Sequence, residues 1–312
     1  MHRVLLTDPI HPDAEILLRG FAEPVLLPDA DHATLYRLAA ETDGIIVRRN
    51  LPDDIFARAP RVKAAVRHGA GVDMIPLDGA HAAGVTVANV PGINARAVAE
   101  FAIACLQHLR RPVAALDARL RQSSWDEARA LSGGFSLLEG TTLGIVGLGS
   151  VGVQVARIAN GFGMKVVSPQ RARPLPEGVD AIDLDALFAA SDHIVLSCPL
   201  NAETLGLVSR DRLQRMKPTG VLINVARGPV VDTAALIEAL TQGRIAGAST
   251  DVYDVQPLPA DSPLRDCPHL LLTPHCAGSV PSVVRDLSLA AVDEMQRVLA
   301  GQPPRNPIRL SK

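Results

Sequence analysis

A glycine-rich turn constrains the fold of this chain more than any other feature. The stretch LGIVGLGSVG, residues 143–152, ends an apolar run with Gly147, Gly149 and Gly152, and the amphipathic segment VGVQVARIANGFG continues from it. The first glycine permits a tight turn, the second lets the backbone approach a pyrophosphate, and the third lets a helix pack closely on a strand. The helix N-terminus adds N–H groups and a partial positive charge for phosphates. A strand, this turn and a helix in succession predict a dinucleotide-binding unit.

Short β-branched runs alternate with helical patterns on both sides of this turn. On its N-terminal side we expect strands at residues 4–7, 24–28, 44–48, 62–69 and 85–91. On its C-terminal side the series continues through MKVVS, HIVLSCP, GVLINVA, IAGAST and LLLTP. This alternation predicts right-handed βαβ units and parallel sheets. Because 312 residues exceed one typical domain, we expect two α/β domains, with the turn opening the second.

Two long helical segments accompany these series. ARAVAEFAIACLQHLRR follows Asn94, a residue type suited to cap it, and is apolar on most faces, which predicts burial. PSVVRDLSLAAVDEMQRVLAG, residues 281–301, has the pattern of an amphipathic C-terminal helix.

Composition argues against several classes of function. A net charge of −2 disfavours an electrostatic partnership with nucleic acid or a membrane surface. The N-terminal MHRVLLTDPIHPDAE is unlike a signal peptide, and no apolar run approaches the roughly 18 residues that span a bilayer. The four cysteines lack the CxxC spacing of zinc sites. We therefore expect a cytoplasmic protein without a metal centre.

The residues after the next expected strand bear on the choice of dinucleotide. An acidic residue about 20 positions after the first glycine usually binds the adenine-ribose hydroxyls. Here that strand ends at Ser168, and PQRAR follows with Arg171 and Arg173. Arginines can pair with a 2′-phosphate, which a carboxylate would repel, so the sequence favours NADP. NAD stays open, because arginines in such a loop are commonly only solvated.

Three later strands end in polar residues that are candidates for a site. GVLINVA runs into Arg227, IAGAST into Asp251 and LLLTP into His275. Ligands of doubly wound sheets bind beyond the carboxyl ends of the strands, so we expect these residues at the same edge as the glycine turn.

Together these motifs resemble the D-isomer-specific 2-hydroxyacid dehydrogenases, which include phosphoglycerate dehydrogenases and glyoxylate/hydroxypyruvate reductases. The resemblance covers nearly the whole chain and rests on RHGAGVD, GLGSVG, INVARGPVVD, TDVYDVQPLP and TPHCAG. It implies two doubly wound parallel-sheet domains: a Rossmann coenzyme domain, residues 96–282, inserted into a flavodoxin-like substrate domain, residues 1–95 and 283–312. It also implies a homodimer, with the helix after Asn94 near the domain crossing and the dimer contact.

The resemblance implies an NAD(P)-dependent enzyme that transfers hydride between a nicotinamide and a small 2-oxoacid or D-2-hydroxyacid. Arg227 would bind the substrate carboxylate, where its planar guanidinium suits bidentate pairing. Backbone N–H groups around Gly69, Ala70 and Gly71 would hold the same carboxylate from the other domain. His275 would give a proton to the carbonyl oxygen during reduction and take it back during oxidation.

The family pattern also implies a set of coenzyme contacts. Those already named are Gly147, Gly149, Gly152, Ser168, Arg171, Arg227 and His275. Ser150 and Val151 are expected at the pyrophosphate, Val225 and Ala226 beside the nicotinamide, and Asp251 near the nicotinamide amide. The remaining expected contacts are Ala277 and the residues Pro199 and Thr204 of a P-L-x-x-x-T loop. Ser197 stands where the family often has histidine, which puts one coenzyme contact in doubt.

One departure bears on catalysis. A glutamate in the family hydrogen-bonds the catalytic histidine, and Gln256 occupies that position here. A carboxylate within about 4–6 Å can raise an imidazole pKa by roughly 1–3 units, whereas an amide orients the ring without adding charge. If Gln256 faces His275, we expect the histidine to titrate near its ordinary pKa of about 6.5, so that reduction weakens as the pH rises through that region.

Two other functions stay open on sequence alone. NAD-dependent formate dehydrogenases resemble this family and carry glutamine at the same position, and their reaction needs no proton transfer. Some relatives bind dinucleotide as non-catalytic regulators, although Arg227 and His275 argue for an enzyme. Arg48 and Arg49 end an early strand, where phosphoglycerate dehydrogenases place a basic residue against the substrate phosphate. Arg48 is therefore a candidate for a second anionic group of the substrate, and the identity of the 2-oxoacid is not determined.

Overall fold

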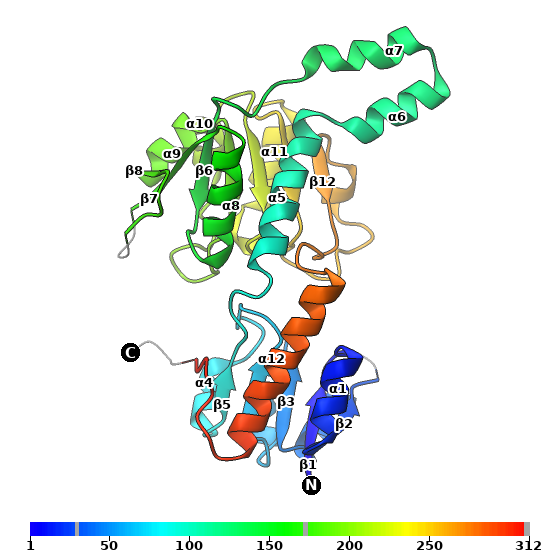
Figure 1. Cartoon of the computed structure of the whole chain (residues 1–312), viewed down its shortest axis with the longest axis vertical. Coiled ribbons are helices and arrows are strands. Elements are labelled where there is room, and N and C mark those ends of the chain that lie inside the picture. The colour runs from blue at the N-terminus through cyan, green and yellow to red at the C-terminus, as the bar shows by residue number, and fades with distance from the viewer. Residues whose placement is uncertain (29–30, 171–173, 309–312) are drawn as a thin grey trace. The chain divides into compact units, whose positions relative to one another are not determined.

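Contacts within the chain divide it into two units. The computed structural model describes residues 1–28, 31–170 and 174–308. Unit 1 comprises Met1–Asn94 and Ser279–Lys312, and unit 2 comprises Ala95–Gly278 (Figure 1). The sequence predicts the first crossing after residue 95 and the return at residue 283, within one and four residues of these boundaries. Which unit binds coenzyme and which binds substrate stays a prediction.

Unit 1 contains a five-stranded parallel sheet in the order β2-β1-β3-β4-β5. Its strands are β1 (His2–Leu6), β2 (Ala22–Leu26), β3 (Gly44–Val47), β4 (Ala64–Arg67) and β5 (Thr86–Ala88). This is the strand order of flavodoxin-like folds, as the resemblance implied. The tail of the chain returns to the open edge, where Ile308 N donates to Val87 O at 2.9 Å.

Helices cover both faces of this sheet. They are α1 (Pro12–Arg19), α2 (His32–Ala40), α3 (Ile55–Arg58), α4 (Leu77–Ala82) and α12 (Pro281–Leu299). One apolar cluster joins Leu35 and Phe56, from α2 and α3, to the sheet, and a second joins Leu18 and Met295, from α1 and α12, to its other face. The C-terminal helix therefore belongs to the first α/β unit, which explains its amphipathic pattern.

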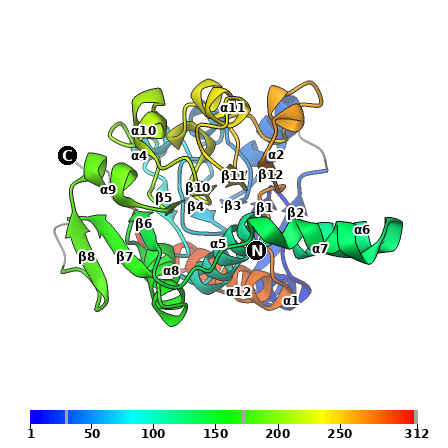
Figure 2. The same cartoon turned by 90° about the horizontal axis from the view of Figure 1, so that it is seen from above.

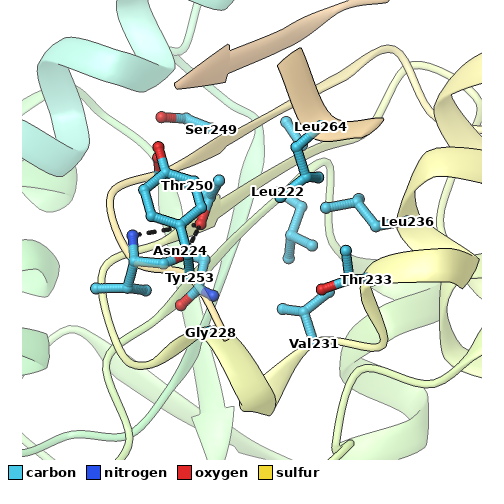
Figure 3. Close-up of a pocket in the computed structure, with 12 residues that line it drawn as sticks. Leu222, Asn224, Gly228, Val231, Thr233, Leu236, Ser249, Thr250, Tyr253 and Leu264 are labelled. Atoms are coloured by element: carbon cyan, nitrogen blue, oxygen red, sulfur yellow. Dashed lines mark hydrogen bonds between the residues drawn. The ribbon is translucent and has the colours of Figure 1, made fainter. Parts of the chain in front are cut away.

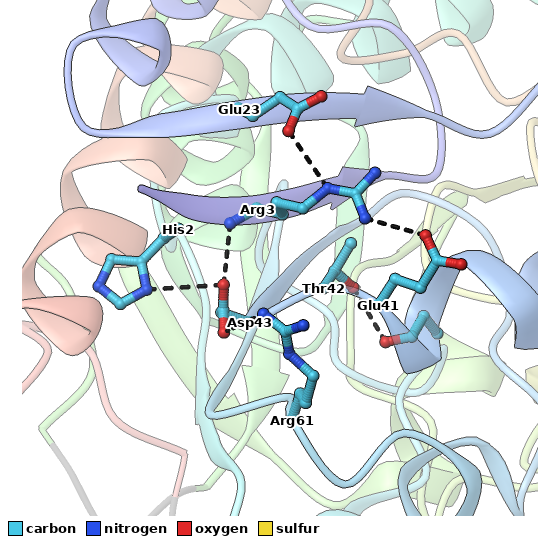
Figure 4. Close-up of polar contacts among 8 residues, drawn as sticks. His2, Arg3, Glu23, Glu41, Thr42, Asp43 and Arg61 are labelled. Atoms are coloured by element: carbon cyan, nitrogen blue, oxygen red, sulfur yellow. Dashed lines mark hydrogen bonds and ion pairs between the residues drawn. The ribbon is translucent and has the colours of Figure 1, made fainter.

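An ion-pair network covers the amino ends of the first strands of unit 1 (Figure 4). Arg3 on β1 lies 3.2 Å from Glu23 and 2.9 Å from Glu41, while its backbone N–H donates to Asp43 at 2.9 Å. Asp43 also pairs with His2 and Arg61. These charges lie at the end of the sheet opposite the carboxyl edge, which is the edge where ligands of doubly wound sheets bind.

Unit 2 contains a seven-stranded parallel sheet in the order β12-β11-β10-β9-β6-β7-β8. Its strands are β6 (Thr142–Val146), β7 (Lys165–Pro169), β8 (Val179–Ile182), β9 (His193–Leu196), β10 (Val221–Asn224), β11 (Gly247–Thr250) and β12 (Leu270–Leu272). The order reverses beside β6, the strand that runs into the glycine turn. This is the doubly wound Rossmann arrangement with one added strand, and the reversal is where such sheets bind ligands.

Two layers of helices enclose this sheet (Figure 2). Helices α5 (Ala95–Arg110) and α8 (Ser150–Gly161) pack on one face, and α9 (Leu184–Ala190), α10 (Arg210–Arg215) and α11 (Thr233–Thr241) pack on the other. Short 3-10 helices occur at η1 (Leu131–Gly134), η2 (Gly228–Val230) and η3 (Pro263–Asp266).

Helix α5 is buried along most of its surface, as its sequence predicted. Seven of its residues are buried, among them Val98, Ala102 and Leu106, whereas Arg96 and Glu100 are exposed. The predicted burial is therefore confirmed for most of the helix: the exposed residues, Arg96, Glu100, Ala104 and His108, form a single stripe, and the other faces pack against α8 and the sheet.

Two helices form an arm beyond the end of α5: α6 (Val113–Gln122) and α7 (Trp125–Ala130). Figure 1 shows them extending away from the rest of unit 2. Apolar side chains on the arm are exposed: Val113 by 68%, Leu120 by 47% and Trp125 by 66%. Helix α6 contacts α7, but none of its residues is buried among the residues that the structure describes, so part of its apolar surface is exposed.

Across the described residues, the structure contains no helix long and apolar enough to cross a membrane. The same part of the chain contains no group of three histidine, cysteine or carboxylate side chains arranged to hold a metal ion.

Candidate active site

The carboxyl edge of the unit 2 sheet gathers the polar residues that the sequence singled out. The glycine turn follows β6, Ser197 follows β9, and Arg227 comes three residues after the end of β10. Asp251 follows β11, and His275 comes three residues after the end of β12. Because all seven strands are parallel, these segments share one edge.

Close packing explains two of the three glycines in the turn. A Cβ atom on Gly147 would lie 2.4 Å from Cys198 N, and this residue has a φ of +102°. A Cβ atom on Gly152 would lie 2.1 Å from Gly147 O. Neither position therefore accepts a side chain without movement of the backbone.

The second glycine is different, because a Cβ atom on Gly149 would meet nothing within 4 Å. Gly149 is the N-cap of α8 and provides no side-chain cap for the helix. Gly149 and Ser150 are exposed and Val151 is half-buried. Open space before an uncapped helix N-terminus fits a diphosphate, since the helix dipole favours anions there. The residues present therefore fit a dinucleotide, and their contacts with it stay predictions.

Of the two residues expected near the adenine ribose, the structure describes Ser168 but not Arg171. Ser168 is buried, and its hydroxyl donates to Ile145 O at 2.8 Å, which ties β7 to β6. Arg171 and Arg173, on which the preference for NADP rests, lie outside the described residues. An open groove of about 510 Å³ lies beyond the ends of β7 and β8 and is lined by Pro169, Gln170 and Asp183, among others.

A buried asparagine shapes the backbone that carries Arg227. Asn224 ends β10, accepts from Ala226 N and donates to Arg227 O, both at 3.0 Å. The next residue, Gly228, is packed so tightly that a Cβ atom would lie 2.1 Å from Tyr253 C. Arg227 is half-buried, and its guanidinium donates from Nη1 to Ala226 O at 2.7 Å.

Asn224 is not among the site residues that the sequence predicted. Its signal was an amide side chain at the end of an apolar strand, since a buried amide must find hydrogen-bond partners. Val225 and Ala226, the expected nicotinamide-side residues, form the short segment that Asn224 holds.

Asp251 organises the loop that carries His275. Its carboxylate is 2% exposed. Oδ1 accepts from Thr273 Oγ1 at 2.7 Å and from Cys276 N at 2.9 Å, and Oδ2 accepts from Ala277 N at 2.9 Å. These three bonds bracket His275 on both sides. Ala277, an expected coenzyme contact, is buried in the same loop.

His275 is held in an unusual conformation beside Gln256. Its φ is +52°, in the left-handed region that few residues other than glycine adopt. Its Nδ1 lies 2.8 Å from Gln256 Oε1. Gln256 Nε2 donates to Tyr253 O at 3.3 Å, which orients the amide oxygen toward the histidine. The neutral imidazole therefore carries its proton on Nδ1, so Nε2 is the atom that would exchange a proton with a substrate.

The Pro199–Thr204 loop is closed by its own hydrogen bonds. Thr204 Oγ1 donates to Pro199 O at 2.6 Å, and Asn201 N donates to Thr204 Oγ1 at 2.8 Å. These bonds give the loop a defined shape before any ligand arrives. The predicted coenzyme contacts of Pro199 and Thr204 stay predictions.

A small cavity of about 20 Å³ lies beneath the Gly228 loop (Figure 3). Asn224, Thr250 and Tyr253 line one side, and Leu222 and Leu236 line the other. A water molecule needs roughly 10–15 Å³ of such space, so the cavity can hold about one water and no substrate.

Unit 1 has its own polar carboxyl edge. Arg67 Nε donates to Gly71 O at 3.0 Å, Asn89 Nδ2 to Ala70 O at 2.6 Å, and Val90 N to Gly69 O at 2.8 Å. These bonds define the loop predicted to bind a carboxylate. Gly69 N itself donates to Arg67 O at 2.9 Å, and the contacts of Gly69, Ala70 and Gly71 with a carboxylate stay predictions.

The basic residues near this loop have identifiable roles in unit 1. Arg48 donates from Nη1 to Pro9 O, and Arg49 pairs with Asp8 at 2.8 Å. His68 is buried, and burial, followed by the charge of Arg48, lowers its pKa to about 4. Ser288 Oγ donates to Val284 O, so it accepts a hydrogen bond from His68 Nε2 at 2.8 Å.

Comparison with known proteins places this architecture in a family. A family model described as "D-isomer specific 2-hydroxyacid dehydrogenase, NAD binding domain" matches residues 103–277. Over 307 residues the chain is 34% identical to D-3-phosphoglycerate dehydrogenase of Mycobacterium tuberculosis, with coverage of 96% of this chain and 57% of that protein. The chain thus spans little more than half the length of this relative. It is 33% identical to hydroxypyruvate reductase of Thermotoga maritima over 96% of this chain and 98% of that protein.

Solved structures agree with this relationship. An NADPH-dependent glyoxylate/hydroxypyruvate reductase from Sinorhizobium meliloti, in complex with NADP and malonate, superposes with a TM-score of 0.87 at 30% identity over 100% of this chain and 99% of that one. An NAD-dependent formate dehydrogenase from Staphylococcus aureus, in complex with NAD, superposes with a TM-score of 0.87 at 27% identity over the full length of both chains.

Proposed function

Because this chain belongs to the D-isomer-specific 2-hydroxyacid dehydrogenase family, we propose that it transfers hydride between a nicotinamide coenzyme and a small 2-oxoacid or D-2-hydroxyacid. The observation that carries the proposal is the shared sheet edge. One edge of unit 2 presents an open glycine turn, Arg227, and a histidine constrained by Gln256 and by the Asp251-bound loop. An anion-binding group and an acid–base group beside a dinucleotide turn are what such a reaction requires.

In the proposed mechanism, Arg227 pairs with the substrate carboxylate and orients the adjacent carbonyl. The nicotinamide, when bound, supplies or accepts the hydride. During reduction the doubly protonated His275 donates its Nε2 proton to the carbonyl oxygen while Nδ1 stays bonded to Gln256. During oxidation the neutral ring accepts the hydroxyl proton at Nε2. Asp251 keeps the loop in place throughout, because its three hydrogen bonds are formed without a ligand.

For the substrate we propose glyoxylate or hydroxypyruvate, the substrates named for the Sinorhizobium reductase, with phosphohydroxypyruvate as the candidate in which Arg48 would meet a second anion. For the coenzyme we propose NADP. Ser168 stands in place of an acidic residue, and Arg171 and Arg173 follow it in the sequence. Comparison of kcat/KM for NADPH and NADH tests the coenzyme, and a large preference for NADH would contradict the proposal.

The decisive assay measures absorbance at 340 nm with each 2-oxoacid and each reduced coenzyme. His275→Asn is expected to lower kcat by at least about 100-fold, the scale of general acid catalysis. Asparagine tolerates a positive φ, so the loop is retained. His269, the other non-glycine residue with a positive φ among the described residues, provides the control, and His269→Asn is expected to keep full activity. Equal loss in both variants, or no turnover of any 2-oxoacid by the parent, would overturn the proposal.

A second candidate is the oxidation of formate. The observation that favours it is the contact of His275 with a neutral amide, together with the structural similarity to the staphylococcal formate dehydrogenase. Formate oxidation releases carbon dioxide by hydride transfer and needs no proton donor at the carbonyl. An increase in absorbance at 340 nm with formate and NAD, and none with 2-hydroxyacids, would favour this function.

We further propose a homodimer in which the α6–α7 arm contacts a second copy of the chain. Its exposed Val113, Leu120 and Trp125 form an apolar surface that a monomer would leave in water. Sedimentation velocity is expected to give a dimeric mass for the parent. Leu120→Arg with Trp125→Ala is expected to give a monomer, and a monomeric parent would contradict the proposal.

A further inference from the structure

Ser197 stands where the family often has histidine, and the function proposed above assigns it no role. We propose that Ser197 is a positioning residue for the coenzyme: its hydroxyl fixes the peptide of Gly147 and so holds the glycine turn in the shape that accepts a diphosphate. This inference rests on the proposed use of a dinucleotide by unit 2.

Two adjacent hydrogen bonds tie Ser197 to the strand and turn opposite it. Its N–H donates to Val146 O at 2.9 Å, which continues the β6–β9 ladder. Its hydroxyl donates to the next carbonyl, Gly147 O, at 2.7 Å, an ideal length for this type of bond. The side chain therefore extends the ladder by one bond, at the point where the backbone leaves the sheet to form the turn.

The surrounding packing makes Gly147 O the centre of the turn. The Cys198 backbone approaches Gly147 from the β9 side, and the Cα of Gly152 approaches the Gly147 oxygen from the helix side. A Cβ atom on Gly152 would lie 3.1 Å from Ser197 Oγ. Ser197 Oγ therefore lies beside both the first and the third glycine of the turn, and among the described residues its hydroxyl is the one side-chain group that donates to Gly147 O.

Hydrogen-bonding capacity separates a positioning role from direct contact. A serine hydroxyl has one proton, and here that proton is directed to Gly147 O. Phosphate diester oxygens only accept hydrogen bonds. Ser197 therefore cannot donate to a diphosphate while it holds the turn, and its effect on the coenzyme is exerted through the backbone.

The test measures dissociation constants for NADPH and NADH by fluorescence titration in Ser197→Ala and in a matched control. Thr141→Val is the control, because Thr141 Oγ1 makes a bond of the same kind, to Leu138 O at 2.6 Å, just before the amino end of β6. Ser197→Ala is expected to raise the dissociation constant about 3- to 10-fold, the scale of one lost hydrogen bond. The KM of Ser197→Ala for the 2-oxoacid and its melting temperature are expected to equal those of Thr141→Val. Ser197→Thr keeps the hydroxyl and is expected to bind coenzyme as tightly as the parent.

Unchanged coenzyme binding in Ser197→Ala, or an equal loss in Thr141→Val, would overturn the inference. So would a folded Ser197→Thr that binds as weakly as Ser197→Ala. Failure of the proposed function has a different signature, because in that case the unmodified protein binds neither NADPH nor NADH.

Discussion

His275 Nδ1 lies 2.8 Å from Gln256 Oε1, and Gln256 Nε2 in turn donates to Tyr253 O. The amide therefore directs an acceptor, without a full charge, at the ring nitrogen. It orients the imidazole as a carboxylate would, but it stabilises the doubly protonated ring less.

Gln256→Glu is expected to raise the apparent pKa that limits 2-oxoacid reduction by about 1 unit or more, because a carboxylate favours the charged imidazole. Reduction requires that charged form, so the gain in kcat/KM is largest on the alkaline side, roughly 5- to 10-fold at pH 8. Complete pH–rate profiles test this. Gln214→Glu adds the same charge at another exposed position and is expected to leave the profile unchanged. Identical apparent pKa values in the parent and Gln256→Glu would remove the argument.

The glycine turn allows packing to be separated from ligand binding. Gly152→Ala places a methyl group 2.1 Å from Gly147 O, so it is expected to destabilise the protein by about 1–3 kcal/mol. Gly149→Ala meets no atom within 4 Å and is expected to leave the melting temperature unchanged. It is expected to weaken coenzyme binding about tenfold or more, since its methyl group occupies the space into which the diphosphate fits. Parent-like coenzyme affinity in Gly149→Ala would contradict the predicted role of that glycine.

Asp251→Asn removes the buried charge that holds the histidine loop. Hydrogen bonds to charged groups contribute about 1.5–3 kcal/mol, and the asparagine amide cannot accept all three. We expect a lower melting temperature and at least about a tenfold lower kcat, because His275 loses its fixed position. Asp254, an exposed carboxylate that accepts from Thr233 Oγ1 at 2.8 Å, provides the control as Asp254→Asn. Parent-like kcat in Asp251→Asn would show that the loop keeps its shape without the carboxylate.

Two buried histidines predict a loss of stability in mild acid. Burial is the main cause that lowers the pKa of His68 and of His193 to about 4, with Arg48 and Arg110 as the next contributors. Since the folded state keeps both rings neutral, the unfolded chain gains protons first as the pH falls below about 6.5. The contribution of each neutral histidine to the free energy of unfolding is therefore fully present above about pH 6.5. It is lost as the pH falls from about 6.5 to about 4, which lowers the free energy of unfolding by up to about 3 kcal/mol per histidine.

Urea unfolding at pH 7 and pH 5 measures this loss. His68→Gln keeps a side-chain N–H that can donate to Ser288 and does not titrate, so its free energy of unfolding is expected to fall less between the two pH values. If the free energy of unfolding falls equally in His68→Gln and in the parent between pH 7 and pH 5, His68 is protonated in the folded protein and the prediction is wrong.

Sequence periodicity and local chemistry determined much of the architecture. The alternation of strands and helices identified the two α/β units, because burial on both faces of a parallel sheet leaves apolar runs that can be recognised one at a time. The glycine turn, Arg227, Asp251 and His275 were recognisable because each follows such a run directly. Strand β8 and helices α4, α6, α7, α9, α10 and α11 were not identified, and of these β8 buries only one of its four residues, which weakens its apolar pattern.

Only the tertiary structure determines the contacts between segments that are distant in the chain. Ser197 reaches Gly147 O because β9 pairs with β6, 50 residues away. Asp251 brackets His275 because β11 pairs with β12, and Gln256 reaches the same ring across 19 residues. The local sequence around a side chain does not identify such partners, because the packing of the whole sheet sets strand order and register. The sequence therefore determined which residues lie at the edge, and the sheet decided which of them hold one another in place.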